Sequence, residues 1–194
     1  MNYKHNKEDV ITKGMHLFWA KGYHNLGVDA ICRETGMTKG AFYNAFKSKE
    51  QFLLTTIENY GNLITAHLQN ELANCETKAF DRLLHLYKGM LEAQPENNHI
   101  GCLVNNTMSE LGILNSTVAS ATSYQFNKFL NVIEPTVKEA QQNQDLTQTI
   151  HSKLLTEIIH TTFFGVLTTS KTTKSSGYTI METFLYALKN RSDE

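Results

Sequence analysis

Side chains that can contact nucleic acid are concentrated in one short part of the sequence. Lys39 and Lys49 can neutralise backbone phosphates, and Tyr43 can donate its hydroxyl to one. Gly40 and Ala41 are small, so a helix that carries them can come close to the base edges. The Ala41 methyl can also touch a thymine methyl. These side chains in this order predict an interface for double-stranded DNA.

Two short helices joined by a tight turn must position these side chains. We expect helices over 28–35 and 39–46, with Gly36 in the turn because glycine adopts a positive φ without a steric penalty. Thr38 is a suitable N-cap for the second helix, and Ile31 is expected to pack inside the angle. In a helix-turn-helix, the second helix lies in the major groove with its first residues at the base edges.

The rest of the sequence also has helical periodicity, so we expect an all-α fold of about nine helices. The chain contains only 2 prolines and 11 glycines, which favours long helices. We expect a three-helix head at 1–47 and a larger body at 48–194 that opens with a long linking helix at about 48–73. Pro135 is expected to kink or break its helix. The other helices are expected at about 8–22, 79–93, 101–112, 116–143, 147–170 and 177–190.

The charge of the chain is unevenly distributed. Residues 1–50 carry eight Lys and Arg against five Asp and Glu, although the whole chain has a formal net charge of -1. A basic head on an acidic body is consistent with a polyanionic partner. The polar N-terminus does not resemble a secretory leader, and no apolar run approaches the roughly 20 residues of a membrane span. We therefore expect a cytoplasmic protein that does not enter a membrane.

The segment 22–52 resembles the signature of the TetR/AcrR family. That signature places a glycine, a hydroxyl residue, Lys-Gly, an aromatic-Tyr pair, Phe and Ser-Lys-Glu in this order. The resemblance implies a dimeric repressor that is released from a palindromic operator by a small-molecule inducer. It also implies that the body binds the ligand and forms the dimer, while the fourth helix links body and head. The matching residues are Gly36, Thr38, Lys39, Gly40, Phe42, Tyr43, Phe46, Ser48, Lys49 and Glu50.

Carried over to this sequence, the resemblance implies DNA contacts at five positions. Two departures affect the interface. Asn44 stands where a histidine is common and is a neutral donor. Leu26 and Gly27 replace the usual Thr-Ser pair, so we expect backbone N–H groups at Gly27 to bind the phosphate instead. A helical adaptor that has lost DNA binding is the alternative that this second departure leaves open. The implied contacts are Thr38, Lys39, Tyr43, Asn44 and Lys49.

The body carries more apolar surface than a single small core needs. We expect a homodimer through about 148–190, because this region has two apolar stripes on one helix and a further apolar helix. Aromatic, Met and amide side chains in the middle helices could line a ligand pocket, although each could equally be core. The candidate pocket residues are Tyr60, His67, Tyr87, Met90, Leu103, Asn106, Tyr124 and Phe163.

Cys102 lies at the predicted start of a helix, where the helix dipole favours a thiolate. The segments around Gly27, Cys102 and Gly165, followed by Lys171, are similar to the branch of the family that includes the N-ethylmaleimide reductase repressor. If Lys171 lies near Cys102, its ammonium would favour the thiolate further. The alternative function is thus a repressor that senses electrophiles or oxidants through Cys102. Cys102 could also be a small buried hydrophobic residue.

Other function classes have little support in the sequence. No nucleophile–base–acid set and no glycine-rich phosphate loop is present, so we expect neither an enzyme nor a cofactor. The three cysteines make no disulfide framework or CxxC metal motif. The histidines lack metal-ligand spacing, since His151 and His160 are nine residues apart. We therefore expect no metal site.

Overall fold

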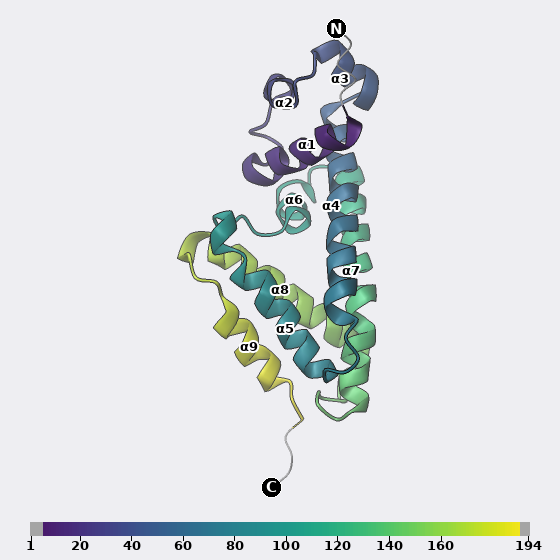
Figure 1. Ribbon diagram of the computed structural model, residues 1–194, viewed down its shortest axis with the longest axis vertical. Helices are drawn as coiled ribbons and strands as arrows, with labels where there is room; N and C mark the ends of the chain where they lie inside the picture. Colours follow the sequence, from purple (N-terminus) through teal and green to yellow (C-terminus); the bar gives the residue numbers. More distant parts are fainter. Residues whose placement is uncertain (1–5, 191–194) are drawn as a thin grey trace. The chain divides into compact units, whose positions relative to one another are not determined.

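The computed structural model describes residues 6–190, and this part of the chain is all-helical (Figure 1). Nine α-helices and one 3₁₀ turn are present, which confirms the predicted fold class, and the described residues form no strand beyond a single bridge between Leu146 and Lys189. The helices are α1 (Lys7–Lys21), α2 (Val28–Thr35), α3 (Lys39–Phe46), α4 (Lys49–Leu72), α5 (Ala79–Glu92), α6 (Leu103–Leu111), α7 (Ser116–Gln142), α8 (Ser152–Thr173) and α9 (Tyr178–Ala187), with the 3₁₀ turn η1 at Pro95–Asn97.

The chain divides into two compact units, each of which is described by itself. The first unit runs to Leu63 and also includes Cys102–Phe126, whereas the second contains Ile64–Gly101 and the chain from Asn127 onward. This grouping does not test the expected division into 1–47 and 48–194, which stays a prediction. The outermost residues of both predicted domains, 1–5 and 191–194, lie outside the described residues.

Aromatic side chains form the core of the first unit. The Phe52 ring of α4 lies 4.5 Å from Phe46 and 5.3 Å from Phe42, centroid to centroid, and 5.8 Å from Phe18 of α1. A Cβ at Gly14 would lie 2.1 Å from Cζ of Phe52, so only a glycine lets α1 approach this ring. Such offset and edge-on pairs add about 0.5–1.5 kcal/mol each beyond the area they bury. This cluster fixes α3 against α1 and α4.

Local capping explains why the short helices begin and end where the sequence predicts. Gly36 ends α2 with φ 75° and ψ 8°, the left-handed conformation that glycine adopts freely. The Thr38 hydroxyl accepts the Ala41 N–H at 3.2 Å, and the Ser48 hydroxyl accepts the Gln51 N–H at 3.0 Å. Both are N-cap bonds, so the predicted starts of α3 and α4 are confirmed.

The second unit packs α5 against α9 and α9 against α8 (Figure 1). Its core includes Tyr87 and Phe163, whose rings lie 5.2 Å apart, and the fully enclosed His160. Helix α7 continues through Pro135 to Gln142, so the expected break is wrong. Proline removes a single N–H from the helix ladder, and the turns on either side of it sustain the helix. Among the described residues, no helix is long and apolar enough to span a membrane.

Candidate nucleic-acid interface

Helix α3 has one buried face and one open face. Phe42 and Phe46 are 0% and 5% exposed, so they anchor the helix in the aromatic core. The intervening positions therefore point away from the core. All predicted DNA contacts on this helix and its cap lie on the exposed side: Thr38, Lys39, Gly40, Ala41, Tyr43 and Asn44. A Cβ at Gly40 would meet nothing within 4 Å, so nothing in the described residues fills the space beside the helix there.

The cap of α3 leaves its hydroxyl able to donate. The Thr38 oxygen accepts the Ala41 N–H, and a hydroxyl that accepts one bond still carries its own hydrogen. Gly27 is the N-cap of α2, is exposed and makes no side-chain cap bond. The first N–H groups of α2 are therefore not covered by a capping side chain, which is the arrangement expected of a phosphate site at a helix start.

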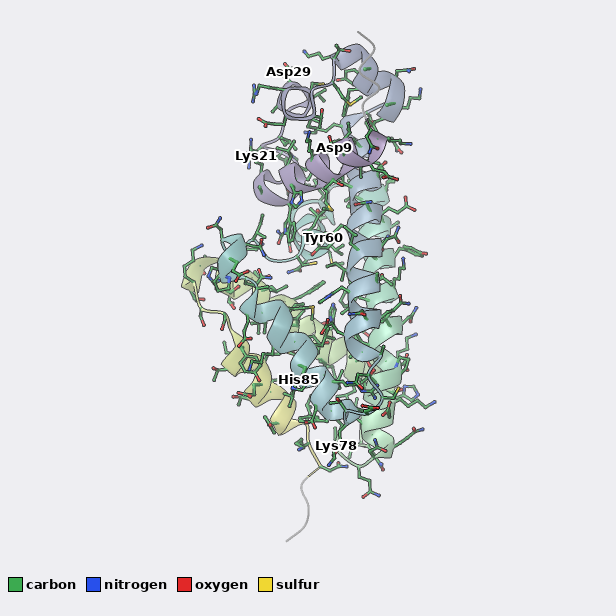
Figure 2. The ribbon with its side chains drawn as sticks, in the orientation of Figure 1. Asp9, Lys21, Asp29, Tyr60, Lys78 and His85 are labelled. Atoms are coloured by element: carbon green, nitrogen blue, oxygen red, sulfur yellow. The ribbon has the colours of Figure 1, made fainter. Side chains whose placement is uncertain are left out.

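Lys39 does not stand alone on this surface. Its Nζ lies 2.7 Å from Oδ1 of Asp29 on α2, and this hydrogen-bonded ion pair raises the pKa of Lys39 (Figure 2 labels Asp29). Both side chains are more than half exposed, so the pair is screened and easily exchanged for a phosphate. Asp29 was not predicted from the sequence, because ten residues separate it from Lys39 and no local pattern links them.

Lys49 is placed differently from the other predicted DNA contacts. Its Nζ donates to the carbonyl of Tyr23 at 3.0 Å and to that of Leu26 at 3.1 Å, and it lies 3.9 Å from the centre of the Tyr23 ring. Burial lowers the pKa of Lys49, and the nearby Glu110 carboxylate opposes that shift. Two of its three N–H donors thus hold the turn between α1 and α2. A phosphate contact by Lys49 stays a prediction that one donor can satisfy.

Leu26 shows what the unusual Leu26-Gly27 pair does for the fold. The Leu26 side chain is 0% exposed, so it belongs to the core of the first unit and not to the surface. The position that commonly carries a hydroxyl residue is therefore an anchor for the turn, and the interface role passes to the backbone at Gly27. Sequence reasoning treated the change as a lost phosphate ligand and missed its packing role.

The predicted pocket residues are distributed over both units. In the first unit, Tyr60 and Leu103 are buried, whereas Tyr124 is 66% exposed. In the second unit, two shallow grooves of about 300 and 400 Å³ are lined by residues outside the predicted set. A shared ligand pocket stays a prediction. Of the remaining candidates, Asn106 and Met90 are half-buried, His67 is exposed, and Tyr87 and Phe163 are buried.

Cys102 is the N-cap residue of α6 and is 6% exposed. The Tyr60 hydroxyl on α4 shares a hydrogen bond with the Cys102 thiol, and the Leu103 N–H donates to the Tyr60 oxygen (Figure 2 labels Tyr60). Burial and the contact with Cys102 raise the pKa of Tyr60. Lys171 lies in the last turn of α8, in the second unit, so its pairing with Cys102 stays a prediction. Within residues 6–190, no group of His, Cys, Asp or Glu is placed to hold a metal ion.

A basic, exposed helix after a tight glycine turn defines a helix-turn-helix regulator of transcription. Comparison with known families agrees: the family described as "Bacterial regulatory proteins, tetR family" matches residues 10–56, and "Tetracyclin repressor-like, C-terminal domain" matches residues 79–180. The chain belongs to the TetR family, which confirms the resemblance found in its sequence.

Individual relatives match over nearly the whole chain. The transcriptional repressor NemR of Escherichia coli K12 is 22% identical over 185 residues, which are 95% of this chain and 92% of NemR. A crystal structure of NemR in its reduced form superposes with a TM-score of 0.79 at 22% identity, covering 94% of this chain and 95% of that one.

Two further solved structures share the fold. The regulatory protein TetR from Rhodobacter sphaeroides has a TM-score of 0.85 at 22% identity and covers 93% of this chain and 96% of its own. FadR from Bacillus subtilis, solved in complex with stearoyl-CoA, has a TM-score of 0.76 at 18% identity over 93% and 96% of the two chains. These relatives are transcriptional regulators, as the helix-turn-helix predicts.

Proposed function

We propose that this protein is a homodimeric repressor that binds a palindromic operator through α3 and is released by a small-molecule inducer. The observation that carries the proposal is the open face of α3, which presents Thr38, Lys39 and Tyr43 above a helix anchored by Phe42 and Phe46. Small residues at its start allow close approach to base edges. No step of this function requires catalysis, so the protein is proposed to be a regulator and not an enzyme.

The dimer is supported by apolar side chains that the single chain leaves open. Leu154 on α8 and Ile180 and Tyr186 on α9 are 54%, 59% and 51% exposed. These residues lie in the region 148–190 that we expect to form the interface. An isologous dimer would present two copies of α3 with two-fold symmetry, which is the symmetry of a palindromic operator.

Fluorescence anisotropy tests the DNA-binding part directly. The purified protein is titrated onto labelled duplex from immediately upstream of its own gene, at several salt concentrations. We expect tight binding that weakens as salt rises, because phosphate contacts release counterions. Lys39→Ala should weaken binding, whereas Lys88→Ala should not, since Lys88 is a similarly exposed, ion-paired lysine on α5. Equal binding by both variants, or no binding by the parent protein, would reject the proposal.

A second candidate, a thiol-responsive repressor, is favoured by the Tyr60–Cys102 contact at the start of α6. This contact gives the buried thiol a hydroxyl partner that an alkylated sulfur cannot keep, so modification would disturb both α4 and α6. The same titration with N-ethylmaleimide separates the two candidates. Release that Cys102→Ser abolishes, and Cys75→Ser does not, supports the thiol switch. Unchanged binding after confirmed alkylation of Cys102 supports a non-covalent inducer.

A further inference from the structure

A carboxylate from α6 holds the turn between α1 and α2. Glu110 accepts the backbone N–H of Tyr23 at 2.9 Å through Oε2 and that of His24 at 2.9 Å through Oε1. Both oxygens are therefore used at once, on two consecutive amides, by a residue more than 80 positions away in the sequence. Hydrogen bonds that involve a charged acceptor are roughly twice as strong as neutral ones.

The turn is shaped to admit this carboxylate. Gly22 has φ 73° and ψ 176°, a conformation that side chains rarely adopt. A Cβ at this position would lie 2.9 Å from Oε2 of Glu110. The glycine thus provides both the backbone direction and the space that the Glu110 side chain occupies. Neither property is needed by a turn that faces only solvent.

The opposite side of the same turn is held by a positive charge. Lys49 donates to the carbonyls of Tyr23 and Leu26, so the turn has its N–H groups on an anion and its C=O groups on a cation. Gly27 follows at once as the N-cap of α2. The position of this turn consequently determines where α2, and α3 packed against it, begin. A second contact, from Asn115 Nδ2 to Glu50 Oε2 at 2.7 Å, ties the chain after α6 to the start of α4.

The other end of α6 carries the Cys102 and Leu103 contacts with Tyr60. From Cys102 to Glu110 the helix rises about 12 Å. A helix of this length moves as a rigid body, so a change at its first residues also displaces the Glu110 carboxylate. Since Glu110 touches the turn through two directional bonds, a small displacement breaks them.

We propose that Glu110 is the positioning residue through which α6 sets the conformation of the DNA-binding helices. The inference rests on the proposed repressor function, because it assigns a path between the regulated part of the chain and the operator. Coupling of this kind is reciprocal: if α6 controls the affinity for DNA, DNA must stabilise α6 by the same free energy.

Hydrogen exchange with residue resolution tests the proposal without knowledge of the inducer. In the parent protein without DNA, the amides of Tyr23 and His24 should be protected. Glu110→Gln should speed their exchange about tenfold, because the new NH₂ group faces an N–H donor and one charge-assisted bond is lost. Glu58→Gln, an exposed glutamate on α4, serves as the matched control and should leave both amides unchanged.

Addition of the upstream duplex separates transmission from a merely structural role. In the parent protein and in Glu58→Gln, we expect DNA to slow exchange in α6 as well as in α2 and α3. In Glu110→Gln, DNA should still protect α3 but not α6. If α6 remains protected by DNA in Glu110→Gln, the inference is wrong, even if Tyr23 and His24 exchange faster. Glu110→Asp, which keeps the charge but shortens the side chain, repeats the test if the Gln variant does not fold.

The same experiment distinguishes this inference from the proposed function. If the parent protein does not bind the duplex, the proposed function fails. If the parent protein binds and α6 shows no DNA-dependent protection, the function stands and the role of Glu110 is rejected.

Discussion

Acid should destabilise this protein through one histidine in the core of the second unit. His160 is 2% exposed and is surrounded by the rings of Tyr87, Phe129, Phe163 and Phe164. Its Nδ1 lies 3.3 Å from the Tyr87 hydroxyl. Burial lowers the pKa of His160 from 6.5 to about 3, because the imidazolium cannot be solvated among these rings.

The sign and size of the effect follow from proton binding. Between pH 6.5 and about 3, the unfolded chain binds a proton at this histidine that the folded chain does not bind. The contribution is therefore fully present above pH 6.5 and is lost progressively as the pH falls. At pH 5, the loss is about 2 kcal/mol, since each unit of pKa difference that is crossed corresponds to about 1.4 kcal/mol.

Urea unfolding followed by circular dichroism at pH 7.5 and pH 5.0 measures this loss at one fixed protein concentration. Each variant is compared with itself at the two pH values, so its absolute stability does not matter. His160→Gln should remove about 2 kcal/mol of the pH dependence. His85→Gln should retain it, because His85 is an exposed histidine on α5 in the same unit (Figure 2). The reasoning is refuted if His160→Gln and the parent protein lose the same free energy of unfolding at pH 5.0.

Three further substitutions test the packing of the first unit. Lys49→Met keeps the length of the side chain but loses both carbonyl contacts; we expect a loss of about 2 kcal/mol in the free energy of unfolding, measured with urea, and a value within 0.5 kcal/mol of the parent protein would argue against the clamp on the turn. Leu26→Ala should cost about 2–5 kcal/mol because the side chain is fully buried, and an unchanged urea midpoint would show that this site is not core. Gly14→Ala should lower the melting temperature, since its Cβ would lie 2.1 Å from the Phe52 ring, whereas Gly40→Ala in open space should not.

The elements that sequence reasoning located well are those that local chemistry determines. Gly36 and Thr38 specify the end of α2 and the start of α3 through bonds that span at most three residues, so both bounds were predicted correctly. Pro135 was misjudged, because the loss of one N–H is a local signal, whereas the persistence of α7 depends on the turns that flank it and on what packs against them.

Contacts between distant parts of the chain were beyond sequence reasoning. Lys49 was assigned to DNA because its type and place in the signature suggested a phosphate, but the carbonyls that it binds lie 23 and 26 residues earlier. Glu110 was not singled out at all, since an acidic residue near the end of a helix carries no pattern that indicates a partner 87 residues away. Such roles depend on the fold and become visible only with coordinates.

The composition of the first unit limits how this regulator can be recombined with others. A chimera that transplants residues 1–47 onto a foreign body would separate the α1–α2 turn from Lys49 and Glu110, which hold it from both sides. Because the unit is built from two stretches of chain, up to Leu63 and from Cys102 to Phe126, a portable reading head must include both. A graft that carries the second stretch should keep its operator preference in a new host protein, whereas one cut at the end of α3 should read DNA poorly even though every base-facing side chain is present.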